Sequence, residues 1–406
     1  MCPLNAKSIS SLSMLSILLL SIIPLSNIVY AAYTKAPPSA AGPTINDSGL
    51  KVEPVAKGLK SPTSMAFLGP NDILVLERAT GRVDRIVNGK ILPKPVLDVN
   101  VASNIERGML GIAIAKHENG PTYVFLYYTE SGGGTDGDDF TSHIPPLGNR
   151  LYRYEWTGDQ LVNPKMILDL PATPPDPAHE TNHMGGKVAI GPDQNVYVII
   201  GEVGGHVSQA ENVKTGPPPD GTGGILRVTQ DGQAVDNGPL GDTPPLNIYY
   251  AYGIRNSFGM DFDPVSGTLW DTENGPAYGD EINLVNPGFN SGYGAIQGGY
   301  AKDNHANPSR DLVKFTKKGT YSDPEFVWSQ TIGPTALKFL NSDTIGSDYK
   351  NHMFIGDINY GNIYNFKLNQ TRTGLEFDNP VLAATNKADS IGELQNMLFG
   401  EIWWYN

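Results

Sequence analysis

One histidine of the chain lies in a setting that suits chemistry. His183 is followed by a Gly-Gly pair, an apolar segment over 187–190, a Gly-Pro-Asp turn and a second apolar segment over 196–200. Because an imidazole titrates near neutral pH, it can take up and release a proton during a reaction. The segment that carries His183 is therefore the first candidate for a reactive site.

Other segments repeat this pattern with a different residue at the position of His183. A structural turn would favour Gly, Asn or Ser there, but four of the five residues are charged or titratable. The five are Lys60, Arg107 (after Glu106), His183, Arg255 (before Asn256) and Ile332. A repeat that varies mainly at the start of its first strand is typical of a scaffold that presents side chains to a shared site, so we expect these residues to converge.

Each repeat predicts a short strand, a turn, a second strand, a variable connection and a third strand. The predicted triplets cover 64–68, 73–76 and 82–86; 111–114, 123–128 and 150–154; 187–190, 196–200 and 224–228; 259–262, 268–270 and 281–285; and 336–339, 353–356 and 363–366. An outer fourth strand is expected from the connection between repeats. Radial repetition of four-stranded sheets avoids exposed sheet edges, so the sequence predicts an all-β propeller.

The composition agrees with many short strands and excludes one class of partner. The 406 residues include Gly 46 and Pro 32, which favours turns over long helices, and 39% are hydrophobic, which is enough for a core. The formal net charge is -13 and no basic run offsets it. This charge argues against a nucleic-acid partner and says little about a neutral substrate.

The N-terminal segment is typical of a secretory signal peptide. Lys7 is the one charge ahead of an apolar run over about 14–29, and a small-residue cleavage site follows at Ala31. We therefore predict a signal peptide over 1–31, a flexible leader rich in Ala, Pro, Ser and Gly over 32–48, and a propeller domain over 49–406. The predicted protein is secreted or otherwise extracytoplasmic, and it contacts a membrane only if the signal segment stays uncleaved.

Several segments, in order along the chain, resemble the soluble glucose/sorbosone dehydrogenase family, which includes the aldose sugar dehydrogenases. The matching segments are 58–59 with Pro62, 65–68, 106–111, 183–186 with 191–193, 224–227, 253–259, and 273–276 with 279–283. The resemblance runs from residue 50 to about 370. It implies a six-bladed β-propeller that binds pyrroloquinoline quinone (PQQ) and calcium and oxidises an aldose to its lactone.

The resemblance also implies roles for individual residues. His183 matches the catalytic base, which takes the hydroxyl proton while a hydride leaves the anomeric carbon for PQQ. Arg255 and Asn256 match residues that bind the cofactor, and Glu106 matches a residue beside the sugar. Asn274 and the carbonyls of Gly275 and Pro276 match a calcium site near the quinone. Glu281 and the carbonyl of Ser291 match a second, structural calcium site. A guanidinium suits an acidic cofactor, and calcium prefers oxygen ligands of this kind.

The sequence departs from the family pattern at three places. Asn359 stands where the family often has a lysine that contacts the cofactor, and the segment 290–294 differs from the usual one. The chain ends at Asn406, where the family pattern continues, so we expect the last blade to be incomplete. Open sheet edges would then lower stability or favour oligomers.

Three other interpretations stay open beside this one. Residues 179–183 match the H-E-x-x-H pattern of zinc proteases, but this pattern needs a helix, and four prolines over 171–177 oppose one. A propeller of this kind can also be a calcium-dependent lactonase, which uses metal to activate water, or a non-catalytic binding module. The acidic segment 136–139 is predicted to be a solvated turn. The sugar and the electron acceptor are not identified by the sequence.

Overall fold

The computed structural model describes residues 42–176, 178–236, 238–298, 306–315 and 318–402. The predicted signal peptide over 1–31 and most of the predicted leader over 32–48 lie outside the described residues. Within the described part, no helix has the length and apolar character needed to cross a membrane.

The first and second sheets of the described chain are antiparallel and follow each other in sequence. The first contains β2 (Pro62–Gly69), β3 (Asp72–Glu77), β4 (Arg82–Val87), β5 (Lys90–Ile91) and β6 (Leu97–Asp98). The second contains β7 (Met109–Ala115), β8 (Thr122–Glu130), β9 (Gly148–Trp156) and β10 (Leu161–Leu170). A short helix, α1 (Asp138–Thr141), lies in the connection between β8 and β9.

The three remaining sheets continue this order and add short outer strands. The third contains β11 (Val188–Ile190), β12 (Val196–Ile200), β13 (Gly224–Val228), β14 (Tyr249–Tyr252), β18 (Phe289–Asn290) and β19 (Thr320–Tyr321). The fourth contains β15 (Gly259–Phe262), β16 (Leu269–Glu273), β17 (Asp280–Val285), β20 (Phe326–Trp328) and β25 (Lys387–Ala388). The fifth contains β21 (Pro334–Phe339), β22 (Met353–Asp357), β23 (Asn362–Leu368), β24 (Leu375–Glu376), β26 (Leu398–Glu401) and β1 (Thr44–Ile45). The helices α2 (Pro308–Asp311) and α3 (Pro380–Thr385) lie in connections.

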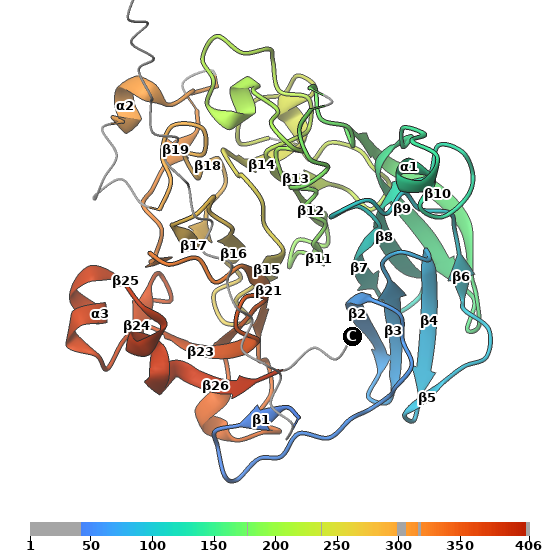
Figure 1. Cartoon of the computed structure of the whole chain (residues 1–406), viewed down its shortest axis with the longest axis horizontal. Coiled ribbons are helices and arrows are strands. Elements are labelled where there is room, and N and C mark those ends of the chain that lie inside the picture. Colours follow the sequence, from blue (N-terminus) through green and yellow to red (C-terminus); the bar gives the residue numbers. More distant parts are fainter. Residues whose placement is uncertain (1–41, 177, 237, 299–305, 316–317, 403–406) are drawn as a thin grey trace, which may run out of the picture. The chain divides into compact units, whose positions relative to one another are not determined.

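The innermost strands of the five sheets are, in order, β2, β7, β11, β15 and β21. In sequence order, β2 contacts β7, β7 contacts β11, β11 contacts β15, and β15 contacts β21. Figure 1 shows these five strands around a common centre, with the later strands of each sheet farther out. Each inner strand pairs antiparallel with the next strand of its sheet. Hydrogen bonds join the loops that precede β7, β11 and β15.

Consecutive sheets pack face to face through shared apolar clusters. One cluster joins the first and second sheets, and further clusters join the second to the third, the third to the fourth, and the fourth to the fifth. In β12, Val196, Val198 and Ile200 pack toward the second sheet, whereas Tyr197 and Ile199 pack toward the fourth. This alternation follows from the two-residue period of a strand, which turns successive side chains to opposite faces.

The described residues confirm the predicted strand pattern. Each of the fifteen predicted segments overlaps a strand, from β2, β3 and β4 to β21, β22 and β23. The expected outer strands are also present, for example β10 and β20. The propeller arrangement is therefore confirmed in general, with five sheets in the described part of the chain; a sixth blade stays a prediction.

The end of the predicted leader takes part in the fifth sheet. Thr44 lies opposite Glu401 and Ile45 opposite Gly400, so β1 pairs with β26 across more than 350 residues of sequence. Asn46 continues this contact, because its amide nitrogen donates to the carbonyl of Phe399 over 2.9 Å. The two ends of the described chain therefore stabilise one sheet together.

The aromatic cluster between the fourth and fifth sheets should be the most sensitive part of the core. Phe366 is fully buried, with its ring centroid 5.5 Å from that of Phe326 and 5.8 Å from that of Trp328. We predict that Phe366→Ala lowers the free energy of unfolding by about 3–5 kcal/mol, since it leaves a cavity in a packed region. The exposed control Val381→Ala should change it by less than about 0.5 kcal/mol. Urea unfolding of both variants measures this, and equal effects would contradict the assignment of the core.

Candidate active site

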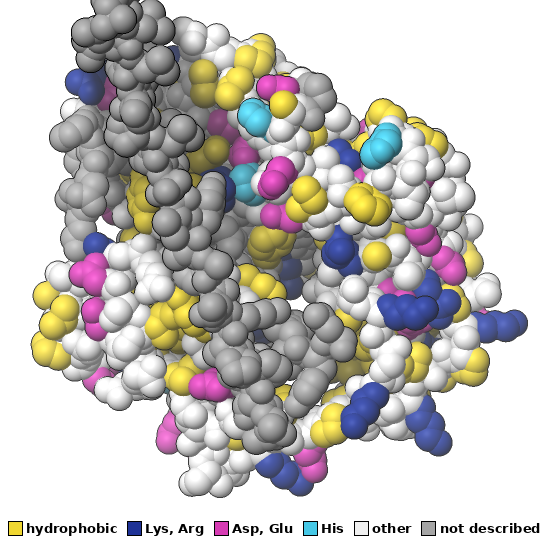
Figure 2. Space-filling model, viewed as in Figure 1, with side chains coloured by type: hydrophobic (Ala, Val, Ile, Leu, Met, Phe, Trp, Pro, Cys, Tyr) yellow, Lys and Arg dark blue, Asp and Glu magenta, His cyan; other side chains and the backbone are white. Residues whose placement is uncertain are grey.

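The loops before β7, β11 and β15 carry the residues that the sequence singled out. Glu106 lies three residues before β7, His183 five before β11, and Arg255 and Asn256 just before β15. Because these inner strands are neighbours, their loops meet at one face. Figure 2 shows histidine, acidic and basic side chains close together near the centre of that face.

The backbone at His183 adopts an unusual conformation. Its φ is +60°, in the left-handed region that few residues other than glycine occupy. Gly186 follows at φ +117°, and a Cβ at that position would lie 2.6 Å from the Cβ of Leu110. Strain of this kind is worth of the order of 1–3 kcal/mol and persists where surrounding contacts hold it. The backbone of this loop is therefore constrained, and it fixes the direction in which the imidazole of His183 leaves the chain.

A buried carboxylate holds the imidazole in place. Nδ1 of His183 forms a close contact with Oε1 of Glu202, which lies two residues after the end of β12 and is 2% exposed. The other carboxylate oxygen of Glu202 accepts a hydrogen bond from the amide of Gly205. With Nδ1 engaged in this way, Nε2 is the nitrogen left for a ligand. Sequence reasoning missed Glu202, although its position at the end of a strand beside the His183 loop was the available signal.

Glu106 and Asn256 join the neighbouring loops. The carboxylate of Glu106 accepts hydrogen bonds from the amide of Met184 over 3.2 Å and from Nδ2 of Asn256 over 3.2 Å. The Oδ1 atom of Asn256 in turn accepts from the amide of Gly185 over 3.2 Å. The structure thus brings Glu106, Asn256 and the His183 loop together, as predicted from their place before the inner strands.

Arg255 lies on the other side of this network. Its Nη1 atom donates to the carbonyls of Asn274 and Gly275 over 3.0 and 3.2 Å, and its amide donates to Oε1 of Glu273 over 2.8 Å. Among the described residues, no carboxylate forms a salt bridge with this guanidinium. Its positive charge is therefore available to an acidic ligand. Tyr293 lies near the same group, and burial raises the pKa of its phenol to about 12.

The residues predicted to hold calcium near the quinone lie against Arg255. The Oδ1 atom of Asn274 is buried and has no hydrogen-bond partner among the described residues, and the amide of Gly275 is fixed by Oδ1 of Asp280 over 2.7 Å. Pro276 is exposed. An unpartnered buried amide oxygen beside two carbonyls fits a hard cation such as calcium. The carbonyl of Gly275 accepts a hydrogen bond from the guanidinium of Arg255 in the structure. On binding calcium, this carbonyl would exchange the guanidinium for the ion.

The second predicted calcium position lies in a buried acidic cluster. Glu281 on β17 lies opposite Glu273 on β16, and the hydroxyl of Ser291 donates to Glu273 over 2.5 Å and to Glu281 over 3.3 Å. Asp271 is fully buried on the same strand as Glu273, and neither of its carboxylate oxygens has a hydrogen-bond partner in the described structure. Among the described residues, no three His, Cys, Asp or Glu side chains are grouped to hold a metal. A cation there would need carbonyl, hydroxyl or amide oxygens beside a carboxylate, which Ser291 and Asn283 offer.

Burial makes these carboxyl groups hard to ionise. It raises the pKa of Asp271 to about 8, with a smaller contribution from the charge of Glu281. Burial and mutual repulsion also raise the pKa values of Glu273 and Glu281 above their usual range. Three such groups without a salt-bridge partner in the described part of the chain are compatible with a bound cation, because a cation favours their ionised forms.

Two expectations about charged residues are wrong. Arg107 does not face the shared site: it is 4% exposed, forms a salt bridge with Asp139 over 2.9 Å and donates to the carbonyl of Ala172. The segment 136–139 is not a solvated turn, because Asp138 and Asp139 are buried and accept hydrogen bonds from backbone amides. The presence of a charged residue in the sequence did not show whether its side chain forms a structural ion pair or faces the candidate site.

The other predicted residues have simple positions. Residues 179–183 form no helix, in agreement with the argument against a zinc protease. Lys60 is exposed, and its amide donates to the buried carboxylate of Glu77 over 2.6 Å. Ile332 is fully buried, with its amide bonded to Asp280. Asn359 donates to the carbonyl of Thr331 over 3.1 Å.

Comparison with known proteins gives a consistent result. The family model for glucose/sorbosone dehydrogenase matches residues 59–388. Quinoprotein glucose dehydrogenase B of Acinetobacter calcoaceticus is 28% identical over 283 residues, which cover 64% of this chain and 56% of the relative. Aldose sugar dehydrogenase YliI of Escherichia coli K12 is 25% identical over 325 residues, which cover 78% of this chain and 79% of the relative.

Solved structures show the same fold. The PQQ-bound form of aldose sugar dehydrogenase from Streptomyces coelicolor superposes with a TM-score of 0.61 at 24% identity. The similarity covers 84% of this chain and 85% of that one. At this identity, the likeness concerns the fold alone.

The acidic cluster predicts an unusual pH dependence of stability. Because the folded state holds protons that the unfolded chain releases above its usual carboxyl pKa near 4, the contribution of this cluster to stability should fall as pH rises from about 4 to about 8. Millimolar calcium should reduce this loss at pH 8 if it binds the ionised groups. Thermal unfolding at several pH values, with calcium or with a chelator, measures both effects.

A matched pair of variants locates the calcium response. Glu281→Gln should remove it, whereas Glu118→Gln, at an exposed position in the connection between β7 and β8, should leave it unchanged. A calcium response of equal size in both variants would contradict a cation site at Glu281.

Proposed function

Because the chain belongs to the glucose/sorbosone dehydrogenase family, we propose that it is a PQQ-dependent oxidoreductase that converts an aldose to its lactone at the anomeric carbon. The single observation that supports this most strongly is the pairing of His183 with buried Glu202 at the face where Glu106, Asn256 and Arg255 meet. The match to glucose and aldose sugar dehydrogenases supports a small sugar as substrate.

His183 is the proposed general base. Oxidation of the sugar requires the anomeric hydroxyl to lose a proton, and Nε2 of His183 takes it. Glu202 keeps Nδ1–H oriented and stabilises the positive charge that develops on the ring. The carboxylate of Glu106 lies beside the backbone of the His183 loop and can accept a hydrogen bond from a second hydroxyl of the sugar.

Arg255 and Asn256 are the proposed cofactor contacts. The guanidinium of Arg255, without a carboxylate partner in the described structure, offers charge to the acidic groups of PQQ, and Asn256 offers an amide. PQQ, when bound, supplies the acceptor for the two electrons and the hydrogen that leave the anomeric carbon, which side chains do not supply.

Two calcium ions are part of the proposal. Asn274 with the carbonyls of Gly275 and Pro276 would hold one beside the cofactor, and Glu281 with the carbonyl of Ser291 would hold the other. The unpartnered Oδ1 of Asn274 supports the first site, and the buried carboxylates around Ser291 support the second. We further propose that the protein acts outside the cytoplasm, as its N-terminal sequence suggests; its electron acceptor is not identified.

The proposal is tested by PQQ binding and sugar oxidation. With calcium present, PQQ should quench the fluorescence of the protein saturably, and the loaded protein should reduce a redox dye when an aldose is added. His183→Ala should bind PQQ but oxidise sugar about 10²–10⁴-fold more slowly, the usual contribution of a general base. Arg255→Ala should weaken PQQ binding. Absence of saturable binding by the folded chain would refute the quinoprotein assignment, and Arg227→Ala, on β13, serves as a control.

The role of Glu202 predicts a distinct variant. Glu202→Gln keeps the shape of the side chain but removes the negative charge beside the imidazole, so oxidation should slow by up to about 10⁴-fold, as when an orienting carboxylate is lost elsewhere. PQQ affinity should stay the same, because the side chain of Glu202 contacts His183 and Gly205. The contact of Glu202 with the proposed cofactor residue Arg255 is made by its backbone amide, which the substitution leaves in place. The measurement is the rate of sugar oxidation by both proteins across a range of pH, together with their PQQ affinities. An unchanged rate in Glu202→Gln would exclude Glu202 from proton transfer.

A further inference from the structure

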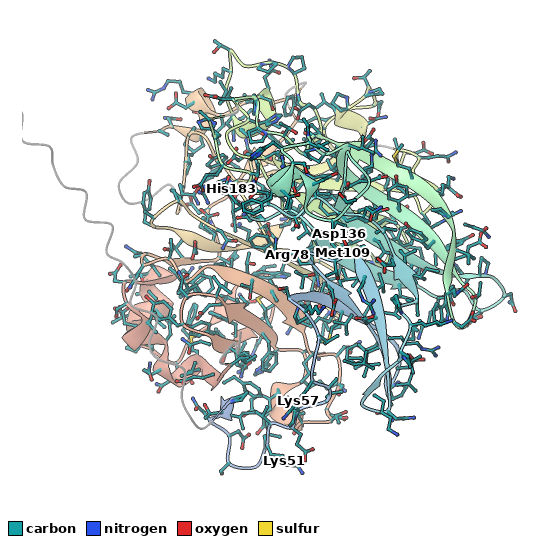
Figure 3. All side chains as sticks on the ribbon, turned by 45° about the vertical axis from the view of Figure 1, so that its right-hand side comes forward. Lys51, Lys57, Arg78, Met109, Asp136 and His183 are labelled. Atoms are coloured by element: carbon teal, nitrogen blue, oxygen red, sulfur yellow. The ribbon has the colours of Figure 1, made fainter. Side chains whose placement is uncertain are left out.

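Arg78 makes an unusual set of contacts with the loop before β7. It directly follows β3, and its Nη1 atom lies within hydrogen-bonding distance of three carbonyl oxygens: those of Ser103 at 3.1 Å, Ile105 at 2.8 Å and Arg107 at 2.8 Å. Its own carbonyl accepts from the amide of Met109 over 2.9 Å. Figure 3 accordingly shows Arg78 beside Met109. One side chain of the first sheet therefore binds a whole segment that leads into the second.

In the described structure, the guanidinium of Arg78 interacts with these carbonyl oxygens rather than with a carboxylate. Among the described residues, no Asp or Glu forms a salt bridge with Arg78, and its side chain is only partly exposed. A hydrogen bond from a charged donor is stronger than one between neutral groups. All three carbonyl oxygens lie around the same nitrogen, Nη1, so one end of the guanidinium holds the segment.

The segment that Arg78 binds is strained. Ile105 has a φ of +53°, which is rare for a β-branched residue, and its side chain is 49% exposed, so burial does not offset the strain. Gly108 is also required, because a Cβ there would lie 2.4 Å from the carbonyl oxygen of Arg78. Strained backbone persists only where neighbouring contacts fix it, and the two N–H groups on Nη1 of Arg78, shared among three carbonyl oxygens, supply such contacts.

A second set of contacts holds the segment from the opposite side. Asp139 accepts hydrogen bonds from the amides of Ser103 and Asn104 over 2.9 and 3.2 Å, and it forms the salt bridge with Arg107. The segment is therefore fixed from both sheets, and the residue that it presents is Glu106. The carboxylate of Glu106 receives its hydrogen bonds from Met184 and Asn256.

We propose that Arg78 is a positioning residue, which fixes the loop 103–107 so that Glu106 meets the loops of His183 and Asn256. Its part in catalysis rests on the proposed function, since it acts through Glu106 and touches no reacting group. Its effect on the loop is a property of the chain alone and is measurable without cofactor.

The first experiment measures amide hydrogen exchange in the full chain without PQQ. In Arg78→Met, the amides of residues 103–107 should exchange about 10–100-fold faster, which corresponds to the loss of about one hydrogen bond from a charged donor. The amides of β8, which lie in the packed second sheet, should keep their rates. The matched controls are Arg78→Lys, which retains the charge and should give an intermediate effect, and Arg85→Lys, which lies on β4 and bonds to Asp72 and Gly158. Unchanged exchange over 103–107 in Arg78→Met would overturn the proposal.

The second experiment asks whether Arg78 acts through Glu106. With PQQ and calcium, Arg78→Met and Glu106→Gln should each lower kcat/KM for the sugar, and the double variant should be no slower than Glu106→Gln alone. Losses that multiply in the double variant would show an independent role and would overturn the proposal. If the wild-type chain oxidises no sugar while the exchange response is present, the proposed function fails and the positioning of the loop stands.

Discussion

Each sheet between two others in this protein has to bury both of its faces, and the rest of the structure depends on this constraint. The strand β12 shows it in five consecutive buried residues, Val196 to Ile200, which alternate between the clusters of the second and fourth sheets. Sheets packed in this way keep their first strands adjacent, and the loops before those strands meet. Glu106, the His183 loop and Asn256 come from three different sheets, yet hydrogen bonds of about 3.2 Å join Glu106 and Asn256 to each other and to backbone amides of that loop.

Polar contacts hold the loops in addition to the apolar burial of side chains such as Met184. His183 and Ile105 both have positive φ values, and each lies next to a charged residue that fixes its loop, Glu202 in one case and Arg78 in the other. A reactive group held by such contacts keeps its orientation before a ligand arrives, which lowers the free energy needed to assemble the site. The apolar core therefore determines where the loops meet, and the polar contacts determine how their side chains point.

The sequence predicted the strands well because their signals are local. Alternating apolar residues and Gly, Pro or Asp turns fix a strand within a few positions, and all fifteen segments overlap strands. The fate of a charge is not local: Arg107 is neutralised by Asp139, 32 residues later, and nothing near Arg107 in the sequence indicates this. Glu202 could have been found, since it follows a predicted strand beside the His183 loop. The number of blades depends on how sheets close around the centre, which no single repeat encodes.

The acidic cluster connects the second proposed calcium site to Arg255 in the candidate active site. Glu273 accepts the amide of Arg255 with one carboxylate oxygen and the hydroxyl of Ser291 with the other. Ser291 also donates to Glu281. A cation bound by Glu281 and the carbonyl of Ser291 would therefore be separated from the backbone of Arg255 by the carboxylate of Glu273. Ionisation of Glu273 strengthens its hydrogen bond to Arg255, and a nearby cation favours that ionisation. The proposed cation at Glu281 and the proposed cofactor contact Arg255 would thus be linked through Glu273, and removal of the cation should weaken the hydrogen bond that holds the backbone of Arg255.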